Sequence, residues 1–378
     1  MFKIVTLNLL LILGLLEFFS LIGVYTNFFT NPSIPTYGGI FSEIDWRTEK
    51  EIWGVWHKKN SKSKSVKSCF NVQYSSNDIG ARDENNYNAE ANNTSIKENI
   101  VLIGDSFAEG FGVELKKSFS KVIEQKSNKR VLNFGTSGDF GPLQGYLLYK
   151  ELASKYSHNE VIIFFLPAND FTDNSFKYQA ELFGDRYRPY FKINEKKKFE
   201  IYYPLASSPS ENFPSIQYST STKLKMLMID FFYMANIYRQ IKNIEKSRST
   251  GIREVLEEGY GYNFNDSESI QGTIFYLDKL FKLLPTEYNK TLIIIPTKPD
   301  LEMILREGFI YKNLQWYSEL RQVALINDIK FLDLALDNEK NSISRLESGI
   351  KNWYLKCDPH WGPSGHADAA LNYLKLGL

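Results

Sequence analysis

The sequence contains few cysteines, few histidines and no excess of either charge. Two of its 378 residues are cysteine and four are histidine. Two cysteines exclude a disulfide-dense scaffold and any four-cysteine zinc or iron–sulfur site. Because 45 basic and 44 acidic side chains leave a net charge of +1, nothing favours nucleic acid or an anionic surface as partner. The scarcity of histidine means that every candidate general base can be weighed individually.

Aromatic side chains are abundant instead. The chain has 27 Phe, 23 Tyr and 6 Trp, which supply a large core and suggest stacking on sugar rings. With 43% apolar and 24% charged residues, the composition excludes disordered, collagen-like and coiled-coil proteins. The length predicts two to three domains, or one large α/β domain with insertions.

An apolar run over residues 4–25 predicts a transmembrane signal anchor. At about 1.5 Å per residue it reaches about 33 Å, enough to cross the hydrocarbon core. Lys3 precedes the run, and Glu43 and Asp45 follow it, so the positive-inside rule puts the remaining chain outside the cytoplasm. A cleaved signal peptide and a buried helix are the alternatives. Glu17, within the run, is expected near the outer interface, protonated, or bound to a partner.

Residues 26–98 form a polar stretch, here called the approach segment, which we expect on the outer side of the membrane. It contains a cluster of Trp46, Trp53 and Trp56. Residues 57–68 carry five lysines and no acid, which predicts a solvated loop, with contact to lipid headgroups as the alternative. Residues 83–95, rich in Asn and acidic side chains, predict another loop.

From residue 99 onward the pattern alternates between strands and helices, which predicts an α/β domain over 99–378. Short apolar runs with many β-branched residues favour a parallel sheet covered on both faces. The predicted strands are 100–103, 131–134, 161–166, 292–295 and 329–334. The predicted helices are 117–125, 143–156, 269–284, 314–327 and 364–376. Residues 171–268 interrupt the alternation and are interpreted as an insertion with a helix over 223–246.

Chemically useful side chains follow the predicted strands, at the edge where parallel α/β sheets bind ligands. Ser106 follows the first strand, where a helix N-terminus favours a nucleophile that develops negative charge. A serine needs a base, and a histidine oriented by a carboxylate serves best. Asp358 and His360 are close enough for one loop to present both. The Ser106 and Gly138 backbone N–H groups and the Asn169 amide are candidate oxyanion donors.

These segments together resemble the SGNH (GDSL-type) hydrolase superfamily. Gly104-Asp105-Ser106 is similar to the first family block, Gly138 to the second, Asn169-Asp170 to the third, and Asp358 and His360 to the last. The resemblance implies a flavodoxin-like three-layer α/β/α sandwich and acyl transfer through a Ser-His-Asp triad, without a cofactor.

Two positions depart from the family pattern. Pro167 stands where a glycine is usual, and the last block reads Asp-x-His instead of Asp-x-x-His. The shorter spacing resembles family branches linked to bacterial surface polysaccharides, some of which are O-acetyltransferases. The predicted activity is therefore an esterase or deacetylase acting on an acyl-carbohydrate. The alternatives are an O-acyltransferase with the same triad and a non-catalytic envelope binding protein.

The other three histidines are weaker candidates for the base. His57 and His158 are expected at the surface, and His366 is expected to be packed or capping inside the last helix. Asp358, His360 and His366 could form only a partial metal site. The glycines of residues 135–141 lack the dinucleotide-binding spacing, so nucleotide binding is not expected.

Cys69 and Cys357 are the only cysteines, and Cys357 adjoins Asp358. In an oxidising compartment they could form a disulfide that ties the approach segment to the loop of the predicted base. The alternative is two buried, unpaired thiols.

Overall fold

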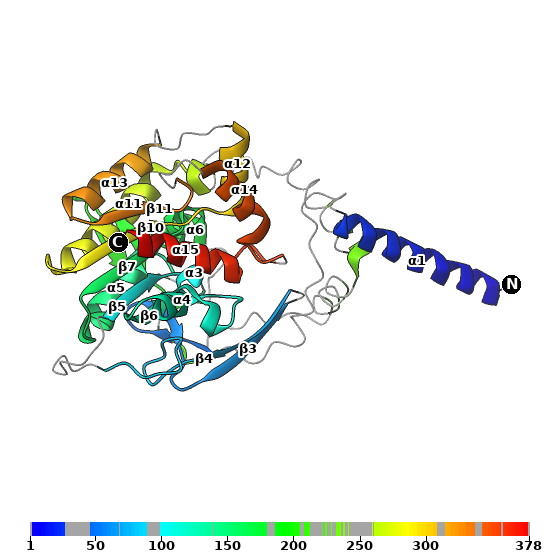
Figure 1. Ribbon diagram of the computed structural model, residues 1–378, viewed down its shortest axis with the longest axis horizontal. Coiled ribbons are helices and arrows are strands. Elements are labelled where there is room, and N and C mark those ends of the chain that lie inside the picture. Colours follow the sequence, from blue (N-terminus) through cyan, green and yellow to red (C-terminus); the bar gives the residue numbers. More distant parts are fainter. Residues whose placement is uncertain are drawn as a thin grey trace.

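A computed structural model describes most of the chain (Figure 1). The described residues are 2–26; 46–204 without 68, 89–98, 139 and 180–185; 208–211; 221, 224, 228, 232–235, 237, 238 and 241; 259; and 261–376 without 308–313, 337–341 and 357. The helix expected over 223–246 therefore lies largely outside the described residues.

The centre of the molecule is a parallel sheet of five strands in the order β11-β10-β7-β5-β6. All five strands predicted from the sequence are confirmed. Their bounds are β5 (Asn99–Gly104), β6 (Arg130–Gly135), β7 (Glu160–Phe165), β10 (Asn289–Ile294) and β11 (Lys330–Asp333). Every residue of β5 and β7 is buried, because helices cover both faces of the sheet.

The strand order reverses beside β5, which pairs with β6 on one side and with β7 on the other. In chain order this is the 2-1-3-4-5 arrangement of a flavodoxin-like sheet, whose ligand site lies at the carboxyl ends of the strands where the order reverses. The carboxyl ends of β5, β6 and β7 therefore mark the expected site.

The helices form two layers that enclose the sheet, which completes the expected α/β/α sandwich. On one side α5 (Pro142–Glu151) and α13 (Gln315–Ile326) pack against α11 (Ser267–Leu283). On the other side α4 (Phe119–Lys126) packs against α15 (Pro363–Lys375) (Figure 1). These are the five predicted helices. The sequence did not predict α3 (Ser106–Glu109), α6 (Pro167–Asp173), α12 (Lys298–Glu307) and α14 (Ser342–Asn352).

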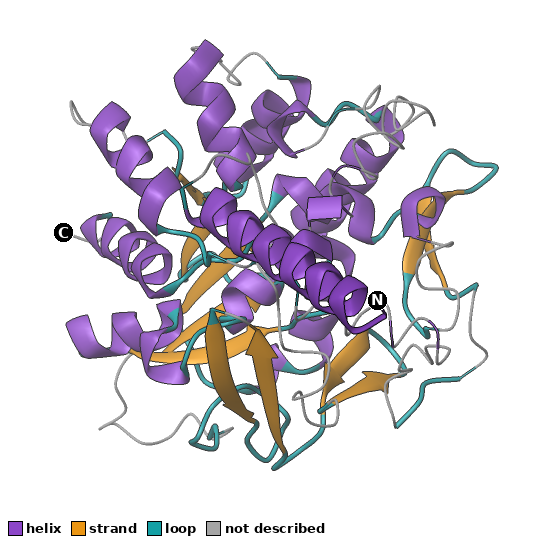
Figure 2. Cartoon of the chain, turned by 90° about the vertical axis from the view of Figure 1, so that its right-hand side faces the viewer, coloured by secondary structure: helices purple, strands orange, loops and turns teal. Residues whose placement is uncertain are grey.

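The approach segment contributes two antiparallel hairpins beside the central sheet (Figure 2). One pairs β1 (Arg47–Lys50) with β2 (Gly54–His57), and the other pairs β3 (Lys62–Lys67) with β4 (Phe70–Ser75). The prediction of a solvated loop over 57–68 is thus wrong. Alternating lysine and small side chains in β3 fit a strand with one solvated face, a pattern that lysine content alone conceals. Residues 83–88 form no helix or strand, as predicted.

The tryptophans of this segment connect it to the sheet. Trp53 and Trp56 belong to the same core cluster as the strands β5 to β7, whereas Trp46 packs with Val72 and Tyr74 in a smaller cluster. All six tryptophans of the chain are at most 9% exposed. They pack the core, and none is free at the surface to stack on a sugar ring.

The inserted residues 171–268 supply a further short helix and hairpin. These are α7 (Phe176–Gln179) and the pair β8 (Tyr190–Ile193) and β9 (Phe199–Tyr202). Phe191 contacts the rings of Phe199 and Tyr276, so the hairpin packs on α11.

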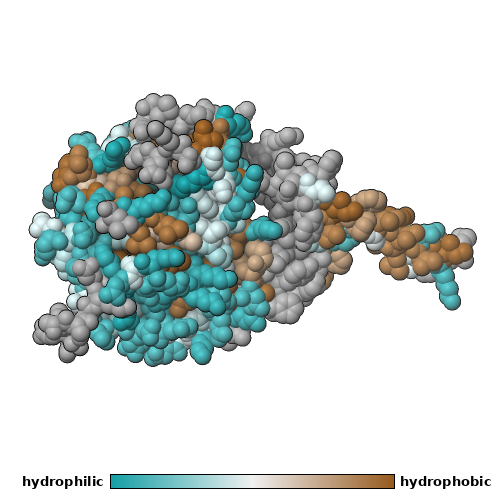
Figure 3. Space-filling model, in the orientation of Figure 1, coloured by the Kyte–Doolittle hydropathy of each residue, from teal (hydrophilic) through white to brown (hydrophobic). Residues whose placement is uncertain are grey.

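Helix α1 (Phe2–Tyr25) projects from the rest of the molecule as an apolar rod (Figures 1 and 3). Its residues Lys3–Gly23 are long and apolar enough to cross a membrane, which also fits a signal sequence. The carboxylate of Glu17 accepts hydrogen bonds from the backbone N–H groups of Tyr233, at 2.6 Å, and Met234, at 3.0 Å. The one acidic group of the run thus has a partner, which was one of the three expectations for it.

Candidate active site

The turn between β5 and α3 places Ser106 at the carboxyl edge of the sheet. Gly104 ends β5 with φ +157°, and a Cβ there would lie 2.7 Å from the Cβ of Phe164. The Asp105 side chain then caps α3 by accepting a hydrogen bond from the Phe107 N–H at 2.9 Å. Each residue of Gly-Asp-Ser thus has a local role: Gly104 allows a close approach, Asp105 caps α3, and Ser106 is the first residue of that helix.

Ser106 meets the predicted base directly. Its Oγ lies 2.6 Å from Nε2 of His360, in the loop before α15. On the other side of the ring, Nδ1 of His360 lies 2.5 Å from Oδ1 of Asp358. The same Oδ1 accepts the backbone N–H of His360 at 3.0 Å, so the short Asp-x-His spacing lets one oxygen orient both groups. Ser106 thus forms one hydrogen-bonded chain with His360 and Asp358, which lie far from it in the sequence.

The surroundings fix the imidazole and keep water from the carboxylate. The ring centroid of His360 lies 5.0 Å from that of Phe107 and 4.6 Å from that of Phe111. The Asp358 side chain is 4% exposed and the His360 side chain 22% exposed. A buried carboxylate beside a partly open imidazole has the arrangement that a serine-activating pair needs, because the carboxylate stabilises the imidazolium that forms.

The two remaining oxyanion candidates follow the strands on either side of β5. Gly138 lies just after β6 with φ +109°, a backbone conformation that favours glycine. Asn169 lies in α6, just after β7, and its Nδ2 donates to Oδ2 of Asp105 at 3.2 Å. Pro167, the departure from the family glycine, is the first residue of α6, where proline is well tolerated.

Two buried carboxyl groups stand behind this edge. Burial raises the pKa of Asp170 well above its usual range, and the charges of Asp105 and Asp173 raise it further. Asp170 accepts the Leu166 N–H at 2.6 Å, which fixes the start of α6. Burial also raises the pKa of Asp105, against the opposing effects of the Phe107 N–H, the His360 charge and Asn169. Asp105 thus contacts Asn169 directly, whereas Asp170 fixes the start of the helix that carries it.

The other histidines have different surroundings from those of His360. Burial lowers the pKa of His366 to about 3, and the charges of Arg82 and His360 act in the same direction. Its Nδ1 accepts the Phe119 N–H at the start of α4, at 3.3 Å, so it is packed and capping as expected.

The expectation of surface positions for His57 and His158 is wrong. His158 is 8% exposed, contacts the Tyr149 hydroxyl at 3.1 Å, and has its pKa lowered by burial. His57 is fully buried and contacts Glu109. Residues distant in the chain help to bury both, Glu109 at His57 and Tyr288 at His158, so the local sequence does not indicate burial.

Glu109 is the residue that sequence reasoning missed at this site. It is 1% exposed, lies three positions after Ser106, and accepts the Ser137 N–H beside Gly138. In the sequence it stands out only as a glutamate in a short turn between a strand and a helix, a position at which a glutamate is normally expected to be exposed to solvent.

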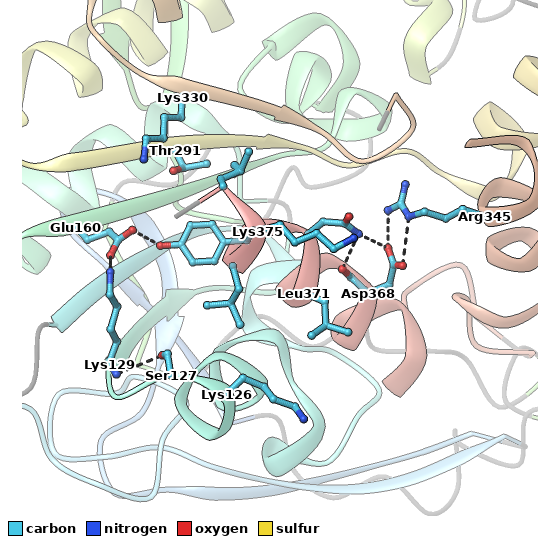
Figure 4. Close-up of a pocket in the computed structure, with 14 residues that line it drawn as sticks. Lys126, Ser127, Lys129, Glu160, Thr291, Lys330, Arg345, Asp368, Leu371 and Lys375 are labelled. Carbon is cyan, nitrogen blue, oxygen red and sulfur yellow. Dashed lines mark hydrogen bonds and ion pairs between the residues drawn. The ribbon is translucent and has the colours of Figure 1, made fainter. Parts of the chain in front are cut away.

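A cavity of about 600 Å³ lies at the opposite edge of the sheet (Figure 4). It is lined by residues near the amino ends of the strands, such as Lys129, Glu160 and Lys330, and by α15. Lys129 and Tyr373 both contact Glu160 across its wall. Since Ser106 lies at the carboxyl ends of the strands, this cavity does not belong to the site.

Within the described residues, no group of three or more His, Cys, Asp or Glu side chains is arranged to hold a metal ion.

Cys69 is disulfide-bonded. Cys357 lies outside the described residues, so its pairing with Cys69 stays a prediction, supported by the fact that the chain has only two cysteines.

Comparison with known proteins gives similarity at the level of structure only. No protein-family model matches the sequence. No curated protein matches it either. Similar solved structures include a member of the lipolytic protein G-D-S-L family from Veillonella parvula, 13% identical, with a TM-score of 0.36, covering 74% of this chain and 97% of that one. A lipase/acylhydrolase from Enterococcus faecalis is 12% identical, with a TM-score of 0.35, and the match covers 74% of this chain and 96% of that one. An alpha/beta hydrolase enzyme from the metagenome of Lake Arreo, Spain, is 10% identical, with a TM-score of 0.39, covering 74% and 94%.

Proposed function

We propose that this protein is a serine esterase of the SGNH type. The observation that carries the proposal is the hydrogen-bonded chain from the Ser106 hydroxyl through His360 to Asp358. Its position at the reversal point of a flavodoxin-like sheet agrees with the general location of sites in such folds.

The geometry supports acylation of Ser106. Nε2 of His360 takes the hydroxyl proton as the oxygen attacks an ester carbonyl, and Asp358 stabilises the resulting imidazolium. The N–H groups of Ser106 and Gly138 and the Asn169 amide would hold the oxyanion. His360 then gives its proton to the leaving alcohol, which completes an acyl-enzyme.

The acceptor of the acyl group decides the overall reaction. Water gives an esterase or deacetylase, whereas a sugar hydroxyl gives an O-acyltransferase by the same triad. The Asp-x-His spacing, similar to that of polysaccharide-linked family branches, favours an acyl-carbohydrate substrate. The non-catalytic alternative is less favoured, because neither Pro167 nor the short spacing disturbs the local geometry.

The location proposed for the domain is outside the cytoplasm, tethered by α1. The apolar span and the single preceding lysine support this orientation. The disulfide at Cys69 supports it independently, since disulfides persist in oxidising compartments.

A fluorophosphonate probe tests the catalytic proposal on the full-length chain in detergent. We expect labelling that disappears in Ser106→Ala and His360→Ala. Ser154→Ala and His158→Gln are matched controls, because Ser154 is exposed after α5 and His158 lies at the opposite edge of the sheet. Absence of labelling in well-folded wild-type protein would contradict the proposal.

Product analysis separates the two reactions. An esterase releases free acetate from an acetylated glycan, whereas a transferase forms an acetylated glycan when an acyl donor is supplied. Labelled protein that does neither would favour a different ester substrate.

A further inference from the structure

Glu109 is a buried carboxylate next to the nucleophile with no role in the triad. It lies on α3, on the side that faces β6, and is 1% exposed. Burial alone would raise the pKa of Glu109. The charge and hydrogen bond of His57, the charge of Arg82 and the Ser137 N–H outweigh burial and lower the pKa to about 2. Glu109 is therefore an ionised group that only accepts hydrogen bonds.

His57 is its partner from the β1–β2 hairpin. Nε2 of His57 lies 3.1 Å from Oε2 of Glu109, and Nδ1 lies 2.8 Å from the Gly80 carbonyl oxygen. The Gly80 carbonyl oxygen and the Glu109 carboxylate oxygen are both acceptors, so both ring nitrogens of His57 face an acceptor. His57 and Glu109 thus form a buried hydrogen-bonded pair.

Two indole rings pack on the imidazole of His57. That of Trp46 stacks on it with centroids 4.1 Å apart, and that of Trp56 lies 5.2 Å away. The other charged or titratable groups facing this pair are Arg82, which donates to the Glu109 backbone oxygen at 3.1 Å, and Tyr74, under the Arg82 guanidinium.

Oε2 of Glu109 also accepts the Ser137 N–H, in the Gly138 loop (residues 136–138). The same hairpin covers this loop from outside. A Cβ on Gly138 would lie 2.9 Å from Nη1 of Arg47 and 3.4 Å from Cγ2 of Val55. The loop is therefore held between α3 and the hairpin.

We propose that Glu109 and His57 are positioning residues that fix the Gly138 N–H toward the oxyanion, an inference that rests on the esterase proposal. An oxyanion donor is effective when it is held in place before the reaction. The contact with His57 also keeps Glu109 from being an unpaired carboxylate, which would repel the developing negative charge. The hairpin of the approach segment is then a working part of the active site.

The test compares Glu109→Ala with Glu109→Gln in the full-length chain, using p-nitrophenyl acetate. Losing one oxyanion donor costs about 100- to 1,000-fold in kcat, so a displaced donor in Glu109→Ala should cost about 10- to 100-fold, with KM little changed. A glutamine whose oxygen takes the place of Oε2 can still accept both the Ser137 N–H and a proton on Nε2 of His57. Glu109→Gln should therefore retain most of the activity. Equal activity of Glu109→Ala and wild type would overturn the proposal.

The pH profile separates positioning from an effect on the triad. We expect the acidic limb of kcat/KM to stay in place in Glu109→Ala while the plateau falls. A shifted acidic limb would mean that Glu109 acts through His360 instead. His158→Gln, which removes another buried histidine pair, is the control and should leave the plateau unchanged.

Hydrogen exchange gives a readout that needs no activity. The Ser137 amide, followed in a peptide covering 133–141, should exchange faster in Glu109→Ala and His57→Ala but not in Glu109→Gln. Unchanged exchange would refute the positioning role even in an active enzyme. If wild type is inactive toward esters but exchange responds as expected, the esterase proposal fails while the structural link stands.

Discussion

Gly135 offers the sharpest steric test of how the sheet positions the nucleophile. It ends β6 beside Gly104 of β5, and α3 passes directly over it. A Cβ at Gly135 would lie 2.1 Å from the backbone nitrogen of Glu109 and 2.4 Å from the carbonyl carbon of Ala108. Both atoms belong to the backbone, so no side-chain rotation relieves the contact, and α3 must move by about 1 Å.

We therefore expect Gly135→Ala to lower two quantities together. Overpacking of this kind costs about 1–3 kcal/mol of stability. A shift of about 1 Å in the nucleophile costs about 100-fold in rate. Thermal unfolding followed by circular dichroism measures the first, and the rate of fluorophosphonate labelling of Ser106 measures the second.

Gly362→Ala is the matched control, since Gly362 also adjoins the site, before α15. A Cβ there would have its nearest contacts at 3.7 Å, an ordinary van der Waals distance. Because alanine is a poorer N-cap than glycine, this variant should lose up to about 1 kcal/mol but keep its labelling rate. If Gly135→Ala kept the labelling rate and the unfolding temperature of the wild type, the argument that the approach of α3 requires glycine would be refuted.

Three further predictions concern single groups. Asp358→Asn should lower kcat by about 10,000-fold with little change in unfolding temperature, because asparagine does not hold the imidazole in the tautomer that activates Ser106. A loss under about tenfold in ester hydrolysis would contradict this. The lowered pKa of Glu109, from 4.5 to about 2, contributes stability that is fully present above pH 4.5 and is lost as the pH falls toward 2. Urea unfolding should show on the order of 3 kcal/mol more acid-induced loss in wild type than in Glu109→Gln, and parallel curves would disprove it. Peptide mapping without reductant should find Cys69 linked to Cys357, and alkylation of both thiols in exported protein would exclude the bond.

The fold was largely predictable because its central strands carry a strong local signal. Runs such as 161–166 are short, apolar and β-branched, and turn residues bound them on both sides. The proximity of Ser106 to the loop of His360 was equally predictable, since strand ends converge at one edge of a parallel sheet.

The parts that were missed depend on contacts distant in sequence. Nothing near His57 indicates that Glu109 and two indoles will bury it, and polar composition obscured the pairing of β3 with β4. The abundance of aromatics suggested a sugar platform, yet the tryptophans lie in the core. The number of aromatic residues therefore does not tell whether they pack the core or bind a ligand.

The position of the β1–β2 hairpin bears on where the protein could be cut and still work. A protease acting between α1 and β1 would free the whole assembly from its tether with His57 still in place. A cut only slightly later, after residue 57, would remove both strands together with Trp46, Trp53 and Trp56. If α1 is the membrane anchor proposed above, release from the membrane and loss of the hairpin would thus be separated by the length of that hairpin.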